Sequence, residues 1–249
     1  MLGRVKRLFK ANGLPHTSDE KVPPAQLRKR VHGSEDLESF EQVGRAISTT
    51  LFDCLSRVEI AGSGLRVLDF GVGCGRVLSP LHHLCETAPF PCPIQWYGTD
   101  IDIDAIKWGK VHLNSLGEFF VNGSHPPLPF ADQFFDFVYS ISVFTHLPED
   151  MQFSWLKEIN RVLKPGGKAV LSAHPFGPAR SLKEERLIAK GFHYIVDRKR
   201  TEGLPSFYQT SCHTRHYIER EWPNYMIVES IVEKGINNDQ TLVLCRRAN

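Results

Sequence analysis

The chain has 249 residues, of which 41% are apolar and 23% charged, which is the composition of an ordinary globular protein of one large or two small domains. A chain of this length buries roughly 70–75% of its unfolded surface, so it needs no disulfide or metal to stay folded. No window approaches 18 consecutive apolar residues, which excludes a membrane-spanning helix. The basic start lacks the apolar core of a signal peptide, and the six cysteines never form a C-x2-C pair. These features predict a cytoplasmic protein with reduced thiols and no metal site.

Charge is unevenly distributed along the chain. Residues 1–31 hold eight lysines and arginines against two acidic residues, whereas the remainder holds 22 basic against 26 acidic residues. A basic arm at residues 1–22 allows weak contact with an anionic membrane surface, but its composition is also that of a solvated, flexible tail. We therefore expect a flexible arm over 1–22. Because the remainder of the chain is acidic, we expect no nucleic-acid partner.

The expected elements alternate between helix and strand. Apolar residues at spacings of three and four predict a helix over about 35–57. Short apolar segments typical of strands then follow, most of them separated by helical stretches: 65–70, 94–100, 118–122, 134–140 and 168–173. Pro148 can open a helix that the KPGG turn at 164–167 ends.

Strands separated by helices predict right-handed crossovers and a parallel, doubly wound sheet. The β-rich segments 226–235 and 240–246 are four residues apart and should pair as an antiparallel hairpin. The predicted fold class is α/β, a Rossmann-like, seven-stranded, mostly parallel sheet with a C-terminal antiparallel hairpin strand. Residues 175–222 are too long for a loop and should form a lid inserted after the fifth strand. A helical cap over 23–62 completes a single domain over 23–249.

Ligands of an open α/β sheet bind beyond the carboxyl ends of the strands, and the informative residues lie there. Gly71, Gly73 and Gly75 follow the first strand, where glycine lets the backbone pass close to a ligand. The third glycine comes one position earlier than in the dinucleotide fingerprint G-x-G-x-x-G. Asp69 repels a pyrophosphate and suits a ligand with a cationic end, and Asp100, ending the second strand, can accept hydrogen bonds from a ribose diol. A ligand with a ribose, a carboxylate and a positive charge describes S-adenosylmethionine.

These segments resemble the class I S-adenosylmethionine-dependent methyltransferases. Four blocks follow the order of that family: VLDFGVGCGR (67–76), YGTDID (97–102), PLPFADQFFDFVYSISVFTHLPED (127–150) and EINRVLKPGG (158–167). Segments outside the core are similar to a subgroup, some of whose members belong to bacterial glycan or secondary-metabolite pathways: 33–45, 203–222 and 235–244. The resemblance covers most of 24–247 and implies a reaction without naming an acceptor.

The resemblance also implies the cofactor, S-adenosyl-L-methionine, and the residues that bind it. Asp69 and the backbone of the glycine turn are implied to hold the methionine part, and Asp100 the ribose hydroxyls. Ile101 is implied to pack on the adenine face and Asn122 to bind its amino group, although the G-D-A triplet usual at this point is absent. Two residues at the end of the fourth strand are implied to line the methionine side: Ser140 and Ile141.

Histidines and aromatic residues near the predicted pocket are the candidates for catalysis and acceptor binding. His146 follows the fourth strand and His174 the fifth, so either can serve as the base for a hydroxyl acceptor, although lone histidines are more often structural. The lid contributes Tyr208, His213 and Trp222, which could bind an acceptor or pack the lid onto the core.

The sequence thus predicts a methyltransferase acting on a small, oxygen-rich acceptor, a sugar or a secondary metabolite, by in-line methyl transfer to oxygen. Two alternatives stay open. A non-catalytic S-adenosylmethionine-binding protein would share the cofactor residues. A nicotinamide-dependent oxidoreductase would share the sheet, but the glycine spacing and Asp69 argue against it.

Overall fold

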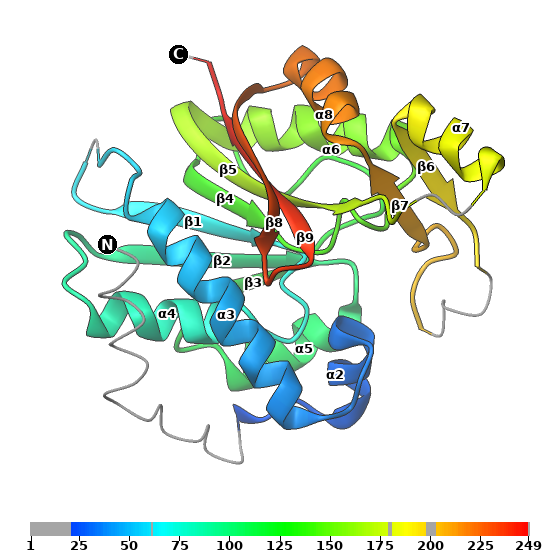
Figure 1. Ribbon diagram of the computed structural model, residues 1–249. Coiled ribbons are helices and arrows are strands. Elements are labelled where there is room, and N and C mark those ends of the chain that lie inside the picture. Colours follow the sequence, from blue (N-terminus) through cyan, green and yellow to red (C-terminus); the bar gives the residue numbers. More distant parts are fainter. Residues whose placement is uncertain (1–20, 61, 179–180, 198–202, 249) are drawn as a thin grey trace.

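The computed structural model describes residues 21–60, 62–178, 181–197 and 203–248. In this part of the chain a twisted sheet is sandwiched between two layers of helices (Figure 1). The predicted arm at 1–22 lies outside the described residues except for its last two. No helix of the described residues is long and apolar enough to cross a membrane.

The main sheet has the strand order that a doubly wound topology produces. Its seven strands are, from one edge to the other, β3 (Glu118–Val121), β2 (Ile94–Asp100), β1 (Leu65–Phe70), β4 (Phe135–Ser140), β5 (Leu163–Pro175), β9 (Gln240–Arg246) and β8 (Ile227–Ile236). The first five run parallel, whereas β9 pairs antiparallel with both β5 and β8. The order reverses between β1 and β4, which places a ligand crevice beyond the carboxyl ends of these two strands. The predicted fold class and the antiparallel hairpin are confirmed.

Helices cover both faces of this sheet. They are α2 (Ala25–His32), α3 (Leu37–Leu55), α4 (Leu78–Thr87), α5 (Ile103–His112), α6 (Glu149–Val162), α7 (Leu182–Lys190) and α8 (Arg215–Glu221). Side chains of α3, α4 and α5 pack on one face of the sheet, and those of α6 and α8 on the other. Because both faces are covered, β1 and β4 are buried almost throughout instead of alternating between buried and exposed residues.

The insert after β5 contains more regular structure than the sequence indicates. It holds α7, α8 and a short antiparallel pair, β6 (Phe192–Ile195) with β7 (Thr210–His213), and β7 meets the end of β5 at His174 and Pro175. The predicted boundary is also inexact at β5, which begins at Leu163, because the KPGG segment continues beside the sheet instead of forming only a turn. The insert lies beside the carboxyl end of the sheet, as predicted (Figure 1).

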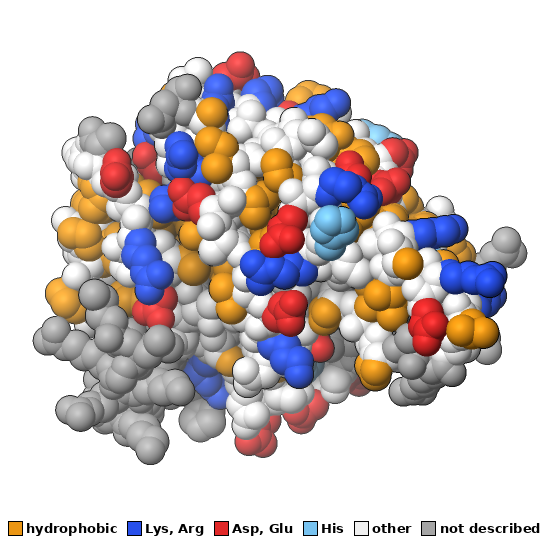
Figure 2. All heavy atoms as spheres, turned by 45° about the horizontal axis from the view of Figure 1, so that its top comes forward, with side chains coloured by type: hydrophobic (Ala, Val, Ile, Leu, Met, Phe, Trp, Pro, Cys, Tyr) orange, Lys and Arg blue, Asp and Glu red, His pale blue; other side chains and the backbone are white. Residues whose placement is uncertain are grey.

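The surface carries charges of both signs. On the face shown in Figure 2, lysine and arginine side chains alternate with aspartate and glutamate, and the described residues of this face form no continuous basic patch.

Candidate functional site

The turn between β1 and α4 is the closest approach of the backbone to the crevice. Gly71 and Gly73 have φ values of +91° and +52°, which favour glycine. A Cβ atom on Gly73 would lie 2.6 Å from a methyl carbon of Val31, and one on Gly71 would collide with Val143. Both glycines line a cleft with an empty volume of about 970 Å³ at the carboxyl ends of the strands. The two glycines therefore let Val31 and Val143 pack directly against the turn at the edge of this cleft.

Two buried carboxyl groups face this cleft from neighbouring strands. Asp69, near the end of β1, is 3% exposed, and burial raises its pKa to about 8, with Tyr139 and Arg76 opposing the shift. Asp100 ends β2 and accepts backbone N–H bonds from Gly73 at 2.7 Å and Asp102 at 2.8 Å. Burial raises the pKa of Asp100 to about 6, although these N–H bonds favour the charged form. Asp100 thus ties the glycine turn to the start of α5 while it lines the cleft.

Most of the predicted cofactor residues line the cleft. Ile101, Asn122 and Ile141 do so together with the residues above. Asn122 donates its side-chain N–H to the Gly123 carbonyl at 2.8 Å, whereas its Oδ1 is buried without a hydrogen-bond partner. A buried unpaired oxygen in a cleft is costly, and a ligand amino group would satisfy it.

Two predicted cofactor residues act behind the cleft and do not line it. Gly75 packs against Leu113, which a Cβ atom would strike. The Ser140 hydroxyl is fully buried and donates to the Phe70 carbonyl at 2.9 Å, which joins the ends of β4 and β1. Both residues pack behind the crevice without lining the cleft.

Helix α2 covers the cleft; it lies within the helical cap expected over 23–62, although the sequence did not indicate its bounds. Arg30 donates to Asp102 at 2.9 and 3.0 Å and to Asp104 at 3.2 Å, so it fastens α2 to the start of α5. Val31 packs on the glycine turn. A signal was present, since Pro24 precedes this helix and Gly33, with φ +76°, ends it.

A second cleft opens beside the first. It has an empty volume of about 2170 Å³ and lies among α2, α3, the insert and the β8–β9 turn. The two clefts share six lining residues: Arg30, Val31, Arg76, Ser142, Leu204 and Tyr208. The two clefts are therefore adjacent, and these six residues form the boundary between them.

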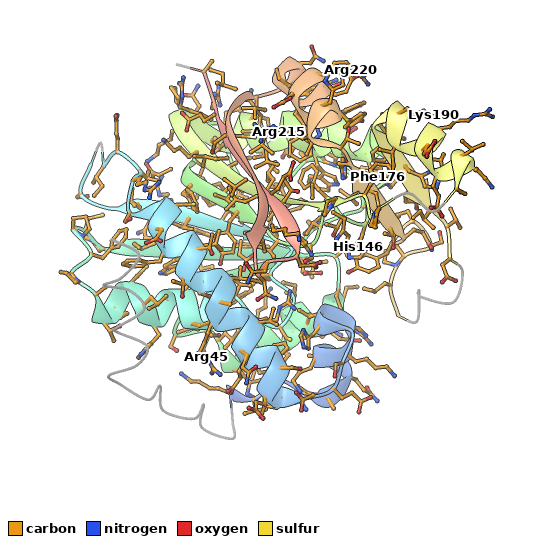
Figure 3. All side chains as sticks on the ribbon, viewed as in Figure 1. Arg45, His146, Phe176, Lys190, Arg215 and Arg220 are labelled. Atoms are coloured by element: carbon orange, nitrogen blue, oxygen red, sulfur yellow. The ribbon has the colours of Figure 1, made fainter. Side chains whose placement is uncertain are left out.

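His146 and Tyr208 line the second cleft, and His146 is labelled in Figure 3. Their rings stack with centroids 3.9 Å apart. His146 Nδ1 lies 2.5 Å from the Gln209 carbonyl oxygen, so this nitrogen carries the hydrogen and donates it. That tautomer leaves the lone pair on Nε2. His174 lines neither cleft, and its ring centroid is 6.5 Å from that of His146.

The structure places the other two lid candidates in the core. His213 is 2% exposed, and its Nε2 donates to Gln152 at 2.8 Å. Burial lowers the pKa of His213 to about 3, so the ring is neutral. Trp222 is fully buried against Phe144 and His213. Neither residue lines a cleft, because His213 bonds to Gln152 of α6 and Trp222 packs in the core, so the acceptor-binding role expected for them is wrong.

Comparison with known proteins agrees with this geometry. Residues 68–171, which run from β1 to β5, match the family model described as a methyltransferase domain. The chain contains a class I S-adenosylmethionine-dependent methyltransferase domain. Its cofactor is accordingly S-adenosylmethionine.

Two curated methyltransferases share part of this domain with the chain. The fatty-acid O-methyltransferase of Mycolicibacterium smegmatis is 36% identical over 104 residues, which is 42% of this chain and 35% of the relative. A phthiotriol/phenolphthiotriol dimycocerosates methyltransferase of Mycobacterium ulcerans is 34% identical over 148 residues, 59% of this chain and 48% of the relative. The chain thus spans less than half the length of either relative.

Solved structures extend the likeness in fold beyond the matched segment. A methyltransferase described as S-adenosylmethionine-dependent, from Methanosarcina mazei, superposes with a TM-score of 0.53 at 19% identity, covering 75% of this chain and 94% of that one. A Pyrococcus horikoshii protein reaches 0.57 at 19% identity, with 97% and 98% covered. The methyltransferase domain of a citrinin polyketide synthase reaches 0.61 at 15% identity, with 90% and 56% covered. At these identities the likeness concerns the fold alone.

The methyltransferase domain should bind its cofactor more tightly as pH rises. The Asp69 pKa of about 8 means that this carboxyl is protonated at neutral pH, and a cationic ligand favours its charged form. Binding below pH 8 therefore releases a proton, and affinity should rise by up to about tenfold per pH unit towards pH 8 and then level off. Calorimetry from pH 6.5 to 8.5 measures this slope.

The Asp69→Asn variant serves as the control, because it cannot titrate and should lose the slope. Equal wild-type affinities at pH 6.5 and 8.5 would contradict the assignment. In the unliganded protein, Asp69 makes the folding stability change with pH in the opposite direction. Its raised pKa means that the folded state binds this proton more tightly than the unfolded chain does. That contribution to stability is complete below pH 3.8 and is lost as pH rises through about 8.

Proposed function

We propose that this protein transfers the methyl group of S-adenosylmethionine to an oxygen atom of a small acceptor bound in the second cleft. The adjacency of the two clefts supports the proposal, because six shared residues form the boundary at which cofactor and acceptor would meet. A protein that only bound the cofactor would not need a second cleft beside the first.

The proposed cofactor residues would each contact a different part of the cofactor. Asp69 and the N–H groups around Gly71 and Gly73 would face the methionine part, and Asp100 the ribose hydroxyls. Ile101 and Asn122 lie near Asp100 and would hold the adenine by packing and by the unpaired Oδ1. Each carboxylate oxygen of Asp100 accepts one N–H bond and keeps capacity for a further donor.

The cofactor supplies an activated methyl group when bound, so the protein has to orient the acceptor and, for some acceptors, take up a proton. Alignment of two reactants at about 3–3.5 Å can contribute roughly 7–11 kcal/mol. A hydroxyl acceptor must also lose its proton, and His146 is the candidate base because it lines the second cleft in a fixed tautomer. His174 lines neither cleft, so His146 is the better placed of the two histidines. A carboxylate acceptor would need no base.

The acceptor that the second cleft suits combines polar groups with apolar surface. Its wall includes Lys29, His32, Asn237 and Gln240, interleaved with Val43, Ile47 and Ile236. Two curated relatives are named for acting on a fatty acid and on phthiotriol dimycocerosates. Within the pair of acceptor classes that the sequence suggested, these names favour a secondary metabolite with an apolar chain over a free sugar.

The experiment is a methyl-transfer assay with isotopically labelled cofactor. Purified protein would be offered fatty acids, hydroxylated aromatic compounds, polyketide-like alcohols and sugars, and labelled products identified by mass spectrometry. We expect an O-methylated product together with a stoichiometric amount of S-adenosylhomocysteine. Binding of the cofactor without transfer to any acceptor of the panel would instead favour the non-catalytic alternative.

Removal of residues 1–22 should leave cofactor affinity within about threefold of the full chain. The described cover of the cleft begins only at Pro24 and Ala25, where α2 starts, and Arg30 anchors it. Calorimetry on the full and shortened proteins tests this. A large loss of affinity would show that the arm belongs to the site.

A further inference from the structure

A buried arginine lies at the boundary between the two clefts. Arg76 directly follows the glycine turn, lines both clefts and is only 9% exposed. Its Nη1 donates to His32 Nδ1 at 3.1 Å, and its Nε is buried without a hydrogen-bond partner. Within the described ranges no carboxylate forms an ion pair with this guanidinium.

His32 orients Arg76 but does not neutralise it. The imidazole lies between Arg76 and the Ser39 hydroxyl, which is 2.8 Å from Nε2. Because Nδ1 accepts from the guanidinium, the hydrogen of a neutral ring is on Nε2. Burial, followed by the charge of Arg76, lowers the pKa of His32, which keeps the ring neutral. The pair therefore retains a full positive charge.

The other cations of the second cleft already have acidic partners. Lys29 lies 3.8 Å from Glu35, and Arg30 pairs with Asp102 at 2.9 Å. Asp69 attracts Arg76 through space, but burial raises the pKa of this carboxyl to about 8, so it is mostly protonated at neutral pH. Arg76 is thus the cleft cation whose charge no described side chain balances.

Such an arrangement is unfavourable for the protein alone. Removing a guanidinium from water without a counter-ion is costly, and arginine does not escape the cost by losing its proton. A planar guanidinium with an unused N–H on a cleft wall is suited to two parallel hydrogen bonds with a carboxylate. An anionic ligand would therefore satisfy both the charge and the unpaired Nε.

We propose that Arg76, held in position by His32, is the carboxylate-binding residue at the junction of the two clefts. The proposal rests on the proposed function, whose reaction offers two carboxylates: that of the methionine part of the cofactor, and that of a carboxylic-acid acceptor. The experiment separates these two sources.

Calorimetry on the wild type would compare two matched pairs of ligands. The first pair is S-adenosylhomocysteine and its decarboxylated analogue. The second, measured with the cofactor site saturated, is decanoate and decanamide. We expect the carboxylate member of at least one pair to bind at least roughly tenfold more tightly than its partner. The pair that shows the preference identifies the source.

The Arg76→Gln variant should lose that preference, whereas Arg220→Gln should keep it. Arg220 lies on the outer side of α8, away from both clefts, and is the matched control (Figure 3). Because the first variant removes a buried unpaired charge, its melting temperature should not fall. Preferences that are equal in all three proteins would overturn the proposal, as would a wild type that shows no preference in either pair.

His32 provides a second measurement that leaves Arg76 in place. His32→Ala should weaken the carboxylate preference severalfold, and His32→Gln, whose amide oxygen can again accept from Nη1, should restore part of it. A merely structural role would lower the affinity for 5′-methylthioadenosine as well, since this ligand lacks any carboxylate. If the wild type failed to bind 5′-methylthioadenosine, the proposed function itself would be wrong. If it bound this ligand normally and both His32 variants kept the wild-type carboxylate preference, only the role assigned to His32 and Arg76 would be wrong.

Discussion

Replacement of Asp100 by alanine should weaken the binding of S-adenosylmethionine and S-adenosylhomocysteine by about 10- to 100-fold. A charge-assisted hydrogen bond contributes about 1.5–3 kcal/mol, and the proposed ribose contact would be lost. The variant also frees the N–H groups of Gly73 and Asp102, which Asp100 holds at 2.7 and 2.8 Å. The glycine turn and the start of α5 would then no longer be fixed to each other. Titration calorimetry measures the affinity, and circular dichroism checks that the fold is kept.

Two variants separate these contributions. Asp100→Asn keeps one acceptor oxygen but loses the charge, so its affinity should lie between those of the wild type and the alanine variant. Asp53→Ala removes a carboxylate of α3 that lines neither cleft, and it should bind the cofactor normally. If Asp100→Ala bound as tightly as the wild type, the ribose assignment would be wrong.

The fold could be predicted from the sequence because its signals are local. Buried strands such as 65–70 are continuous apolar runs, and the glycine turn and the acid at Asp100 follow directly at strand ends. The helical cap over 23–62 was expected, but the bounds of α2 within it were not, because its eight residues are mostly polar, with Leu27 alone buried. Its position depends on Arg30 and Asp102, which are 72 residues apart.

The acceptor site was harder to predict because it, too, depends on contacts between residues far apart in the sequence. His146 and His213 both occur among polar and aromatic neighbours, and only packing distinguishes them. The insert bends so that Gln209 meets His146 at the cleft, while His213 is turned towards Gln152 in the core. In the sequence Arg76 is simply the residue that follows the glycine turn, and its lack of a counter-ion becomes visible only when the neighbouring segments are in place.

With a hydroxyl acceptor, replacement of His146 by alanine should lower kcat by about 100-fold or more. The reason is the loss of the base that takes the hydroxyl proton, a contribution of about 10²–10⁴. Cofactor affinity should stay nearly unchanged, because His146 lines the second cleft but not the first. Initial rates at saturating cofactor, together with calorimetry, separate the two effects.

The pH dependence of kcat distinguishes a lost base from a disturbed pocket. A base must be deprotonated to act, so the wild-type rate should rise with pH until the base is neutral, and this rise should be absent in His146→Ala. His216→Ala is the matched control, since His216 is exposed on α8 and lines neither cleft. A rate that falls in His146→Ala but keeps the wild-type pH profile would show that the ring, stacked on Tyr208 at 3.9 Å, only shapes the pocket. With a carboxylate acceptor we expect the opposite result for His146→Ala, because a carboxylate has no proton to lose. His146→Ala should then keep the wild-type kcat, whereas Arg76→Gln should lose acceptor binding.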